Sequence, residues 1–100
     1  MIERLLLMAT VLTLAACSRD YSPEPQATGE QIFQAACAEC HKAANNGSLF
    51  SLTAEKDNLA YLNQKISQGS WLMPAFKQFS NEDLTKISTY VMERSDIAEQ

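Results

Sequence analysis

The sequence predicts a small all-α domain. Apolar residues recur at three- and four-residue spacing in three separate segments, and no stretch shows the apolar-polar alternation that is typical of a half-buried strand. The chain has 100 residues, which is enough for one small domain and excludes a multidomain enzyme. Each of the three segments carries its own start or stop signal.

The first predicted helix begins at residues 28–31 (Thr-Gly-Glu-Gln), which have the pattern of a capping box. The apolar residues after this box repeat with helical spacing as far as Cys37 and Cys40. We therefore expect a short helix that ends near this cysteine pair.

Two further helices follow along the chain. The second is expected between about Asp57 and Gln68, with Asp57 as its N-terminal cap and Gly69 as its C-terminal stop. The third starts at Ser80, a capping residue followed by acids, and runs to about Arg94. The intervening segments, residues 42–52 and 70–79, are expected to be loops.

The N-terminal region has the pattern of an export signal. An apolar run over residues 5–16 follows Arg4, and it is shorter than the roughly twenty residues that a membrane-spanning helix needs. Residues 14–17 (Leu-Ala-Ala-Cys) resemble the lipobox of bacterial lipoproteins, in which the cysteine receives a diacylglycerol and the chain is cut just before it. The alternative is an ordinary signal peptide, with Cys17 incidental.

The expected organisation follows from this signal. Residues 1–16 form a signal peptide, residues 17–27 a lipid-bearing Cys17 with a flexible polar tether, residues 28–94 the domain and residues 95–100 a C-terminal tail. Pro23 and Pro25 disfavour a helix in the tether. We expect an exported protein, anchored by lipid to a bacterial membrane and facing the periplasm or the outside.

The excess of acidic over basic residues bears on whether nucleic acid can be a partner. Eight Lys and Arg residues stand against twelve Asp and Glu residues, which gives a net charge of −4. Binding to nucleic acid needs a surplus of basic residues to neutralise phosphates. No nucleic-acid partner is therefore expected.

Cys37, Cys40 and His41 form a C-x-x-C-H run, the attachment signature of c-type haem. On a helical turn the two cysteines lie three residues apart and His41 lies four residues after Cys37, so the three side chains share one face. The thiols can then form thioethers with the two porphyrin vinyl groups, and the imidazole can ligate the iron. A domain as small as residues 28–94 usually needs such a cofactor to complete its core.

Other uses of a Cys-x-x-Cys pair fit this chain less well. A thioredoxin-like motif follows a strand in a βαβ unit, a pattern that the sequence lacks. A structural zinc site needs four ligands, whereas the expected domain offers two cysteines and one histidine. A plain structural disulfide between Cys37 and Cys40 remains an alternative.

Met73 is the candidate for the second axial position of the iron. It lies thirty-two residues after His41, and Pro74 keeps it out of regular helix, in a loop that can turn the thioether inward. The other methionine of the expected domain, Met92, lies within the third helix. Methionine also serves as a filler of core gaps, which is the alternative role of Met73.

With these motifs, the segment from about Gly29 to Met92 resembles the class I c-type cytochromes. The resemblance rests on the early C-x-x-C-H run, the later Met-Pro loop and an aromatic-bearing C-terminal helix. It implies a small cytochrome c fold, with three to four helices around one covalently attached haem c. It further implies a crossing of the first and last helices at Gly29, Phe33 and Tyr90. The implied haem residues are Cys37 and Cys40 as thioethers, with His41 and Met73 as axial ligands.

The chain departs from the family after the haem motif. Relatives commonly carry a Gly-Pro-x-Leu segment whose carbonyl accepts a hydrogen bond from the proximal imidazole, but residues 45–50 (Asn-Asn-Gly-Ser-Leu-Phe) contain no proline. A backbone carbonyl in residues 47–52 is the remaining candidate for this role. Trp71 is a candidate donor to a haem propionate, or an ordinary packing residue.

This reading predicts a membrane-tethered single-electron carrier rather than an enzyme. An iron held by both imidazole and thioether changes valence with little rearrangement and offers substrates no free position. The expected partners are redox proteins and, through the lipid, a membrane. The alternatives are a haem-based sensor or peroxidase-like enzyme in which Met73 leaves the iron, or a haem-bearing accessory subunit of a larger oxidoreductase.

Overall fold

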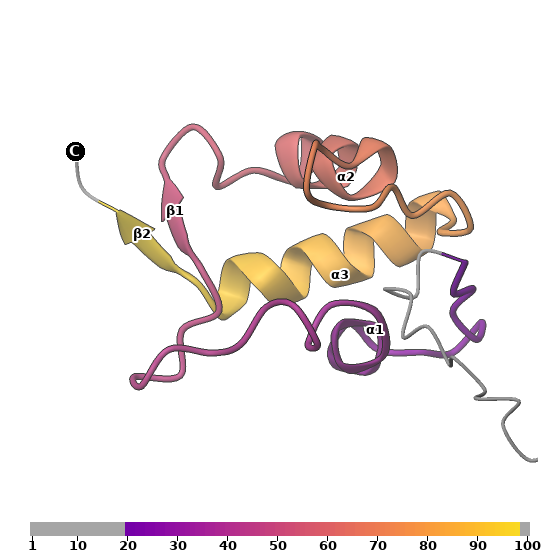
Figure 1. Ribbon diagram of the computed structural model, residues 1–100, viewed down its shortest axis with the longest axis horizontal. Helices are drawn as coiled ribbons and strands as arrows, with labels where there is room; N and C mark the ends of the chain where they lie inside the picture. Colours follow the sequence, from indigo (N-terminus) through magenta and orange to yellow (C-terminus); the bar gives the residue numbers. More distant parts are fainter. Residues whose placement is uncertain (1–19, 99–100) are drawn as a thin grey trace, which may run out of the picture.

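A long C-terminal helix lies between two shorter helices in the computed structural model, which describes residues 20–98 (Figure 1). The elements of this part are α1 (Gly29–Ala36), β1 (Ser51–Thr53), α2 (Leu59–Gln68), α3 (Asn81–Glu93) and β2 (Asp96–Ala98). The predicted small all-α fold is confirmed, with a two-stranded parallel sheet added to it. Each strand has three residues, too few for an alternating pattern to reveal it in the sequence.

The predicted N-terminal caps of α1 and α3 are confirmed. The Thr28 hydroxyl accepts a hydrogen bond from the Gln31 amide at 3.1 Å, and the Gln31 side chain accepts one from the Thr28 amide at 2.9 Å. Ser80 and Asp83 exchange the same pair of bonds at 3.1 and 3.0 Å. Each box satisfies amides that have no partner within the helix.

The cap of α2 differs from the prediction by one residue. Asn58, not Asp57, is the N-cap, and its side-chain oxygen accepts a hydrogen bond from the Tyr61 amide at 2.7 Å. The Asn58 amide group also donates to the Glu55 carbonyl at 2.6 Å, a bond that an aspartate cannot make. The helix ends at Gly69, as predicted. Within residues 20–98, no helix has the length and apolar character needed to cross a membrane.

Gly29 lets α1 cross closely over α3. A Cβ at this position would lie 2.5 Å from the Lys86 carbonyl oxygen and 2.8 Å from the Tyr90 Cβ. Beside this contact the rings of Phe33 and Tyr90 pack with their centroids 5.6 Å apart. The crossing that the family resemblance implied is thus present.

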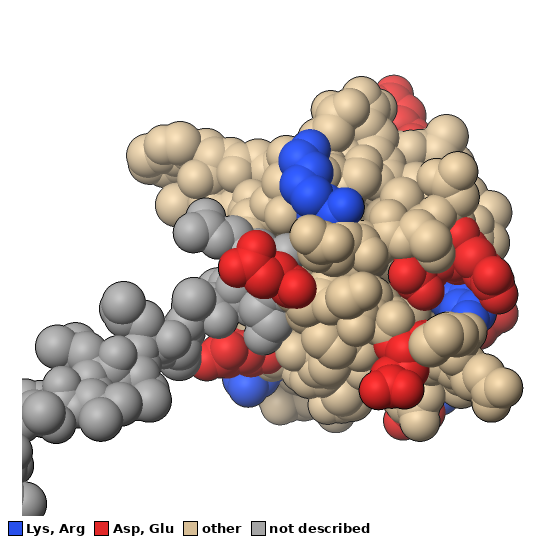
Figure 2. All heavy atoms as spheres, turned by 90° about the vertical axis from the view of Figure 1, so that its right-hand side faces the viewer, with Lys and Arg blue, Asp and Glu red and all other residues tan. Residues whose placement is uncertain are grey.

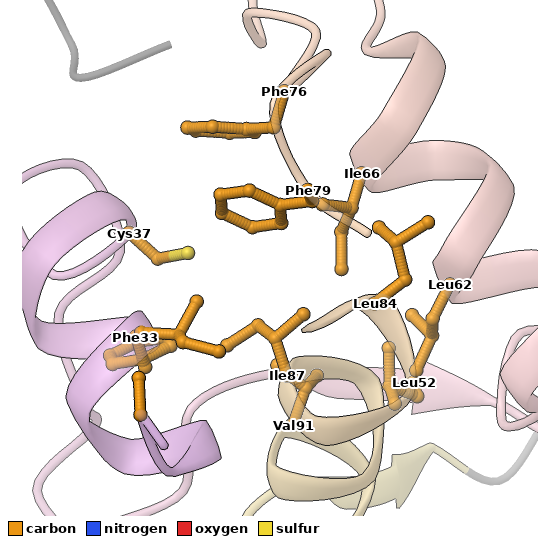
Figure 3. Packing of buried hydrophobic residues seen from close by; sticks show 12 residues of the cluster. Phe33, Cys37, Leu52, Leu62, Ile66, Phe76, Phe79, Leu84, Ile87 and Val91 are labelled. Atoms are coloured by element: carbon orange, nitrogen blue, oxygen red, sulfur yellow. The ribbon is translucent and has the colours of Figure 1, made fainter. Parts of the chain in front are cut away.

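The core lies where α1, α2 and the loop after α2 meet α3 (Figure 3). Ile32 and Ile87, from the facing sides of α1 and α3, are fully buried. On the other side of α3, the buried Ser88 hydroxyl lies 2.6 Å from the side-chain amide of Asn63 in α2. The buried apolar residues are Ala27, Ile32, Phe33, Cys37, Leu52, Leu62, Ile66, Phe76, Phe79, Leu84, Ile87 and Val91.

The segment before α1 contacts the domain. The Tyr21 ring packs edge-on against Phe79 with centroids 6.1 Å apart, and Ala27 is buried. The Lys86 ammonium donates a hydrogen bond to the Pro25 carbonyl at 3.3 Å. Three residues of the predicted tether, Tyr21, Pro25 and Ala27, thus contact the domain. Residues 1–19, which include the predicted signal peptide and Cys17, lie outside the described part.

Candidate haem site

The cysteine motif lies on the turn that follows α1. Cys37 is the C-cap of α1, and its carbonyl accepts hydrogen bonds from the amides of Cys40 at 3.2 Å and His41 at 2.9 Å. These bonds continue the helical path for one more turn. The three predicted haem residues thereby come to line one cavity.

The Met73 loop forms the opposite wall of this cavity. Two cavities of about 170 and 270 Å³ share Cys37, His41 and Met73 in their linings, and together they reach the size of a small-molecule site, about 300–1,000 Å³. The structure thus brings together residues that are thirty-two positions apart in the chain. The rest of the second cavity is mainly apolar and includes Phe33, Phe50, Leu52, Ile66, Ile87 and Val91.

Cys37 presents a buried thiol to this space. Its side chain points from α1 into the hydrophobic cluster (Figure 3) and is 9% exposed. Burial, and secondly the neighbouring Cys40, raises the pKa of the Cys37 thiol to about 11, so the sulfur carries its proton at neutral pH. Cys37 forms no disulfide within the described residues. Cys40 is exposed at the rim.

The His41 imidazole is half-buried at the edge of both cavities. Burial lowers its pKa below the ordinary value of 6.5, because the charged form loses solvation. The neutral imidazole is the form that ligates a metal. The site therefore holds His41 in its ligating form at neutral pH.

Phe50 contacts the His41 ring. The two ring centroids are 4.8 Å apart and the planes are tilted by 56°. The Phe50 ring is thus the neighbour of the imidazole that this segment supplies in the structure, and the hydrogen bond from the imidazole to a carbonyl of residues 47–52 stays a prediction. Sequence reasoning missed Phe50 because it lies in a loop segment without periodicity.

Met73 is held by a tight turn after α2. The Ser70 amide donates to the Met73 carbonyl at 3.0 Å and the Met73 amide donates to the Ser70 carbonyl at 3.2 Å. Gly69 has a φ of +68°, and a Cβ there would lie 2.5 Å from the Met73 carbonyl oxygen, so the turn requires glycine. Met73 is half-buried and lines both cavities, whereas Met92 packs against the core from α3.

Trp71, at the tip of this turn, points outward. Its side chain is 94% exposed, and it lines neither of the two cavities described above. Its expected role as a propionate donor thus finds no support in its position. The polar side chains of Lys56, Tyr61 and Lys65 line the second cavity. The sequence does not reveal this position of the two lysines, because lysines on an ordinary surface have the same pattern.

The surface shown in Figure 2 is mixed in charge. Acidic side chains are scattered over this face, with few basic ones and much uncharged area between them. A surface that binds a phosphate backbone gathers Lys and Arg on one face or stripe, and this face shows no such gathering. It agrees with the net charge of −4.

Comparisons with known proteins find similar chains. The family model described as cytochrome c oxidase, cbb3-type, subunit III matches residues 24–91, a range that contains both the cysteine motif and the Met73 turn. It begins before the predicted domain boundary at residue 28, in the segment where Pro25 and Ala27 contact the domain.

The chain is also similar to individual small cytochromes. It is 29% identical to cytochrome c6 of Cyanidioschyzon merolae over 86% of this chain and 90% of the relative. It is 32% identical to cytochrome c6 of Bumilleriopsis filiformis over 68% of this chain and 90% of that relative. Among solved structures, cytochrome c6C from Synechococcus sp. PCC 7002 superposes with a TM-score of 0.55 and 26% identity, covering 67% of this chain and 93% of that one.

Proposed function

The chain belongs to the class I c-type cytochromes, and on this basis we propose that it is a membrane-tethered single-electron carrier whose haem iron is ligated by His41 and Met73. Membership implies a covalently bound haem c and a role as a small electron carrier. The ligand set and the tether are the proposed part.

One observation supports the ligand set most directly: Cys37, His41 and Met73 line the same two cavities. The donors fit a c-type haem, because thiols, a neutral imidazole and a thioether are the groups that hold it. In the proposed attachment each thiol of Cys37 and Cys40 adds across a vinyl double bond, with sulfur on one carbon and hydrogen on the other. No oxidant is consumed and no group leaves.

The chain's own residues also account for the rest of the cofactor. Phe33, Ile66 and Val91 offer the apolar surface that porphyrin faces need and keep water from them. Lys56 and Lys65 are the cationic groups in the lining of the second cavity, and we assign the haem propionates to them. Bound there, the haem supplies one-electron chemistry at its iron.

Electron transfer fits the site better than catalysis. His41 and Met73 would fill both axial positions, so a substrate finds none open. The two hydrogen bonds between Ser70 and Met73, and a third from the Phe76 amide to the Ile66 carbonyl at 3.0 Å, hold the Met73 turn in place. A sensor or a peroxidase-like enzyme needs this turn to release the iron.

A haem-bearing accessory subunit is the second candidate. It is favoured by the description of the family model, which names a subunit of a cbb3-type oxidase. A subunit and a free carrier use the same haem chemistry and differ in how long they stay bound to a partner. Gel filtration of mildly solubilised native membranes separates the two, because a free carrier elutes as a small species.

The haem iron of the purified wild-type protein should have both axial positions filled. We expect reversible one-electron oxidation and reduction, a c-type absorption spectrum, and carbon monoxide binding to the reduced protein that is slow and incomplete. Absorption spectra of both states, with and without carbon monoxide, provide the measurement. Rapid stoichiometric binding of carbon monoxide would favour the sensor or enzyme instead.

The proposed anchor is a diacylglycerol on Cys17, after removal of residues 1–16. The lipobox pattern of residues 14–17 supports it. Tyr21 is the first residue seen to pack against the domain, so the chain between Cys17 and Tyr21 reaches at most roughly 14 Å. The domain would then sit close to the membrane surface, exported to the periplasmic or outer side.

Cys17→Ser should release the protein from the membrane. Buried acyl chains contribute about 0.8 kcal/mol per CH₂, and a small acidic domain has no comparable attraction to a lipid surface. The measurement is the distribution between membrane and soluble fractions after a high-salt wash. Ser18→Ala, next to the anchor, serves as the control and should stay with the membrane. Retention of Cys17→Ser in the pellet would contradict the anchor.

A further inference from the structure

The C-terminal segment is tied to the loop that follows the haem motif. The Leu49 amide donates a hydrogen bond to the Arg94 carbonyl at 2.8 Å, and the Asp96 amide donates one to the Phe50 carbonyl at 2.9 Å. The strands β1 and β2 then pair in parallel, with Ser51 opposite Asp96, beyond the C-terminal end of α3 (Figure 1). Segments nearly fifty residues apart in the chain thus form one unit.

Side chains reinforce this pairing. The Asn46 amide group donates a hydrogen bond to an Asp96 carboxylate oxygen at 3.1 Å, and the Asn46 side-chain oxygen accepts one from the Ser48 amide at 3.0 Å. The Ser48 hydroxyl accepts a hydrogen bond from the Asp96 amide at 3.1 Å and donates one to the Phe50 carbonyl at 2.9 Å. We call Asn46, Ser48 and Asp96 the tail clamp.

The tail clamp fixes Phe50, the residue whose ring contacts His41. Two donors, the Ser48 hydroxyl and the Asp96 amide, hold the Phe50 carbonyl. On the C-terminal side, Leu52 is buried and paired with Ile97 in the sheet. With its backbone held at both ends, Phe50 keeps its ring 4.8 Å from the imidazole.

We propose that Asp96, through the tail clamp, is a positioning residue that sets the orientation of the His41 imidazole toward the haem iron. The inference rests on the proposed ligation by His41. Residues 45–50 contain no proline to fix their backbone locally, and hydrogen bonds with Arg94 and Asp96 hold this segment instead. The orientation of a ligating imidazole tunes the metal that it binds.

The test compares Asp96→Ala with Asp96→Asn in the haem-loaded protein. The alanine variant loses the acceptor for Asn46, whereas the asparagine variant keeps an oxygen there. We expect Asp96→Ala to displace the paramagnetically shifted His41 ring resonances in the oxidised protein, to change the reduction potential, and to speed exchange of the Leu49 amide at least about tenfold. Asp96→Asn should restore all three toward the wild-type values.

Asp83→Ala provides the matched structural control. It removes an acid that caps α3, so it destabilises the domain without touching the tail clamp. The inference is overturned if Asp96→Ala leaves the His41 resonances and the potential unchanged, or if Asp83→Ala moves them equally. Wild-type His41 ring resonances without a paramagnetic shift would overturn the proposed ligation itself, and this inference with it.

Discussion

Replacing Cys37 and Cys40 together by alanine should abolish covalent haem attachment and remove much of the helical content. Cys37 lies within the hydrophobic cluster, and the cavities beside it interrupt the apolar core. A porphyrin bound in this space would stabilise the fold by about 25 cal/mol for each Å² of apolar surface that it buries. The free energy of unfolding of a domain of this size is only about 4–12 kcal/mol, so the loss of the haem should be felt throughout the fold. Haem staining after denaturing electrophoresis and far-ultraviolet circular dichroism measure the two losses.

Cys17→Ser is the matched control for this experiment, because it removes the third cysteine and leaves the C-x-x-C-H run intact. It should retain the covalent haem and the helical signal. If the double variant kept a wild-type circular dichroism spectrum and unfolding midpoint, the three helices would form a self-sufficient core, and the role of the haem in folding would be contradicted.

Local signals explain which parts of the fold the sequence revealed. A capping box depends on residues three positions apart, so Thr28 with Gln31 and Ser80 with Asp83 identified the starts of α1 and α3 correctly. The sequence predicts the cap of α2 at Asp57 rather than at Asn58, because both residue types can accept the bond. The choice depends on the carbonyl of Glu55, which only the folded turn brings within reach.

The residues of the haem motif are also close together in the sequence, whereas the residues that surround the motif in the fold are far from it in the sequence. Cys37, Cys40 and His41 share a single turn, so their spacing predicts that they lie together. Phe50 contacts His41 and directly precedes β1, which pairs with β2 just beyond the C-terminal end of α3. No periodicity marks such a short parallel pairing, so neither Phe50 nor Asp96 stood out in the sequence.

Met73→Ala should leave the haem covalently attached but open its sixth position. The substitution removes a half-buried thioether that faces both cavities. A thioether favours ferrous over ferric iron, so its loss should lower the reduction potential by on the order of 100–200 mV, within the roughly 0.8 V that axial ligands span. The reduced variant should bind carbon monoxide rapidly. A redox titration and a stopped-flow measurement of carbon monoxide binding test these expectations.

Met92→Leu separates the loss of a ligand from the loss of a methionine. Met92 packs against the core from α3, and a change that conserves side-chain volume should cost less than about 1.5 kcal/mol of stability. Its potential and its carbon monoxide kinetics should match the wild type, because the turn that presents Met73 is held by Gly69 and Ser70 and does not depend on Met92. If Met73→Ala left the potential unchanged while Met92→Leu lowered it, the second axial ligand would come from α3 and the proposed ligand set would be wrong.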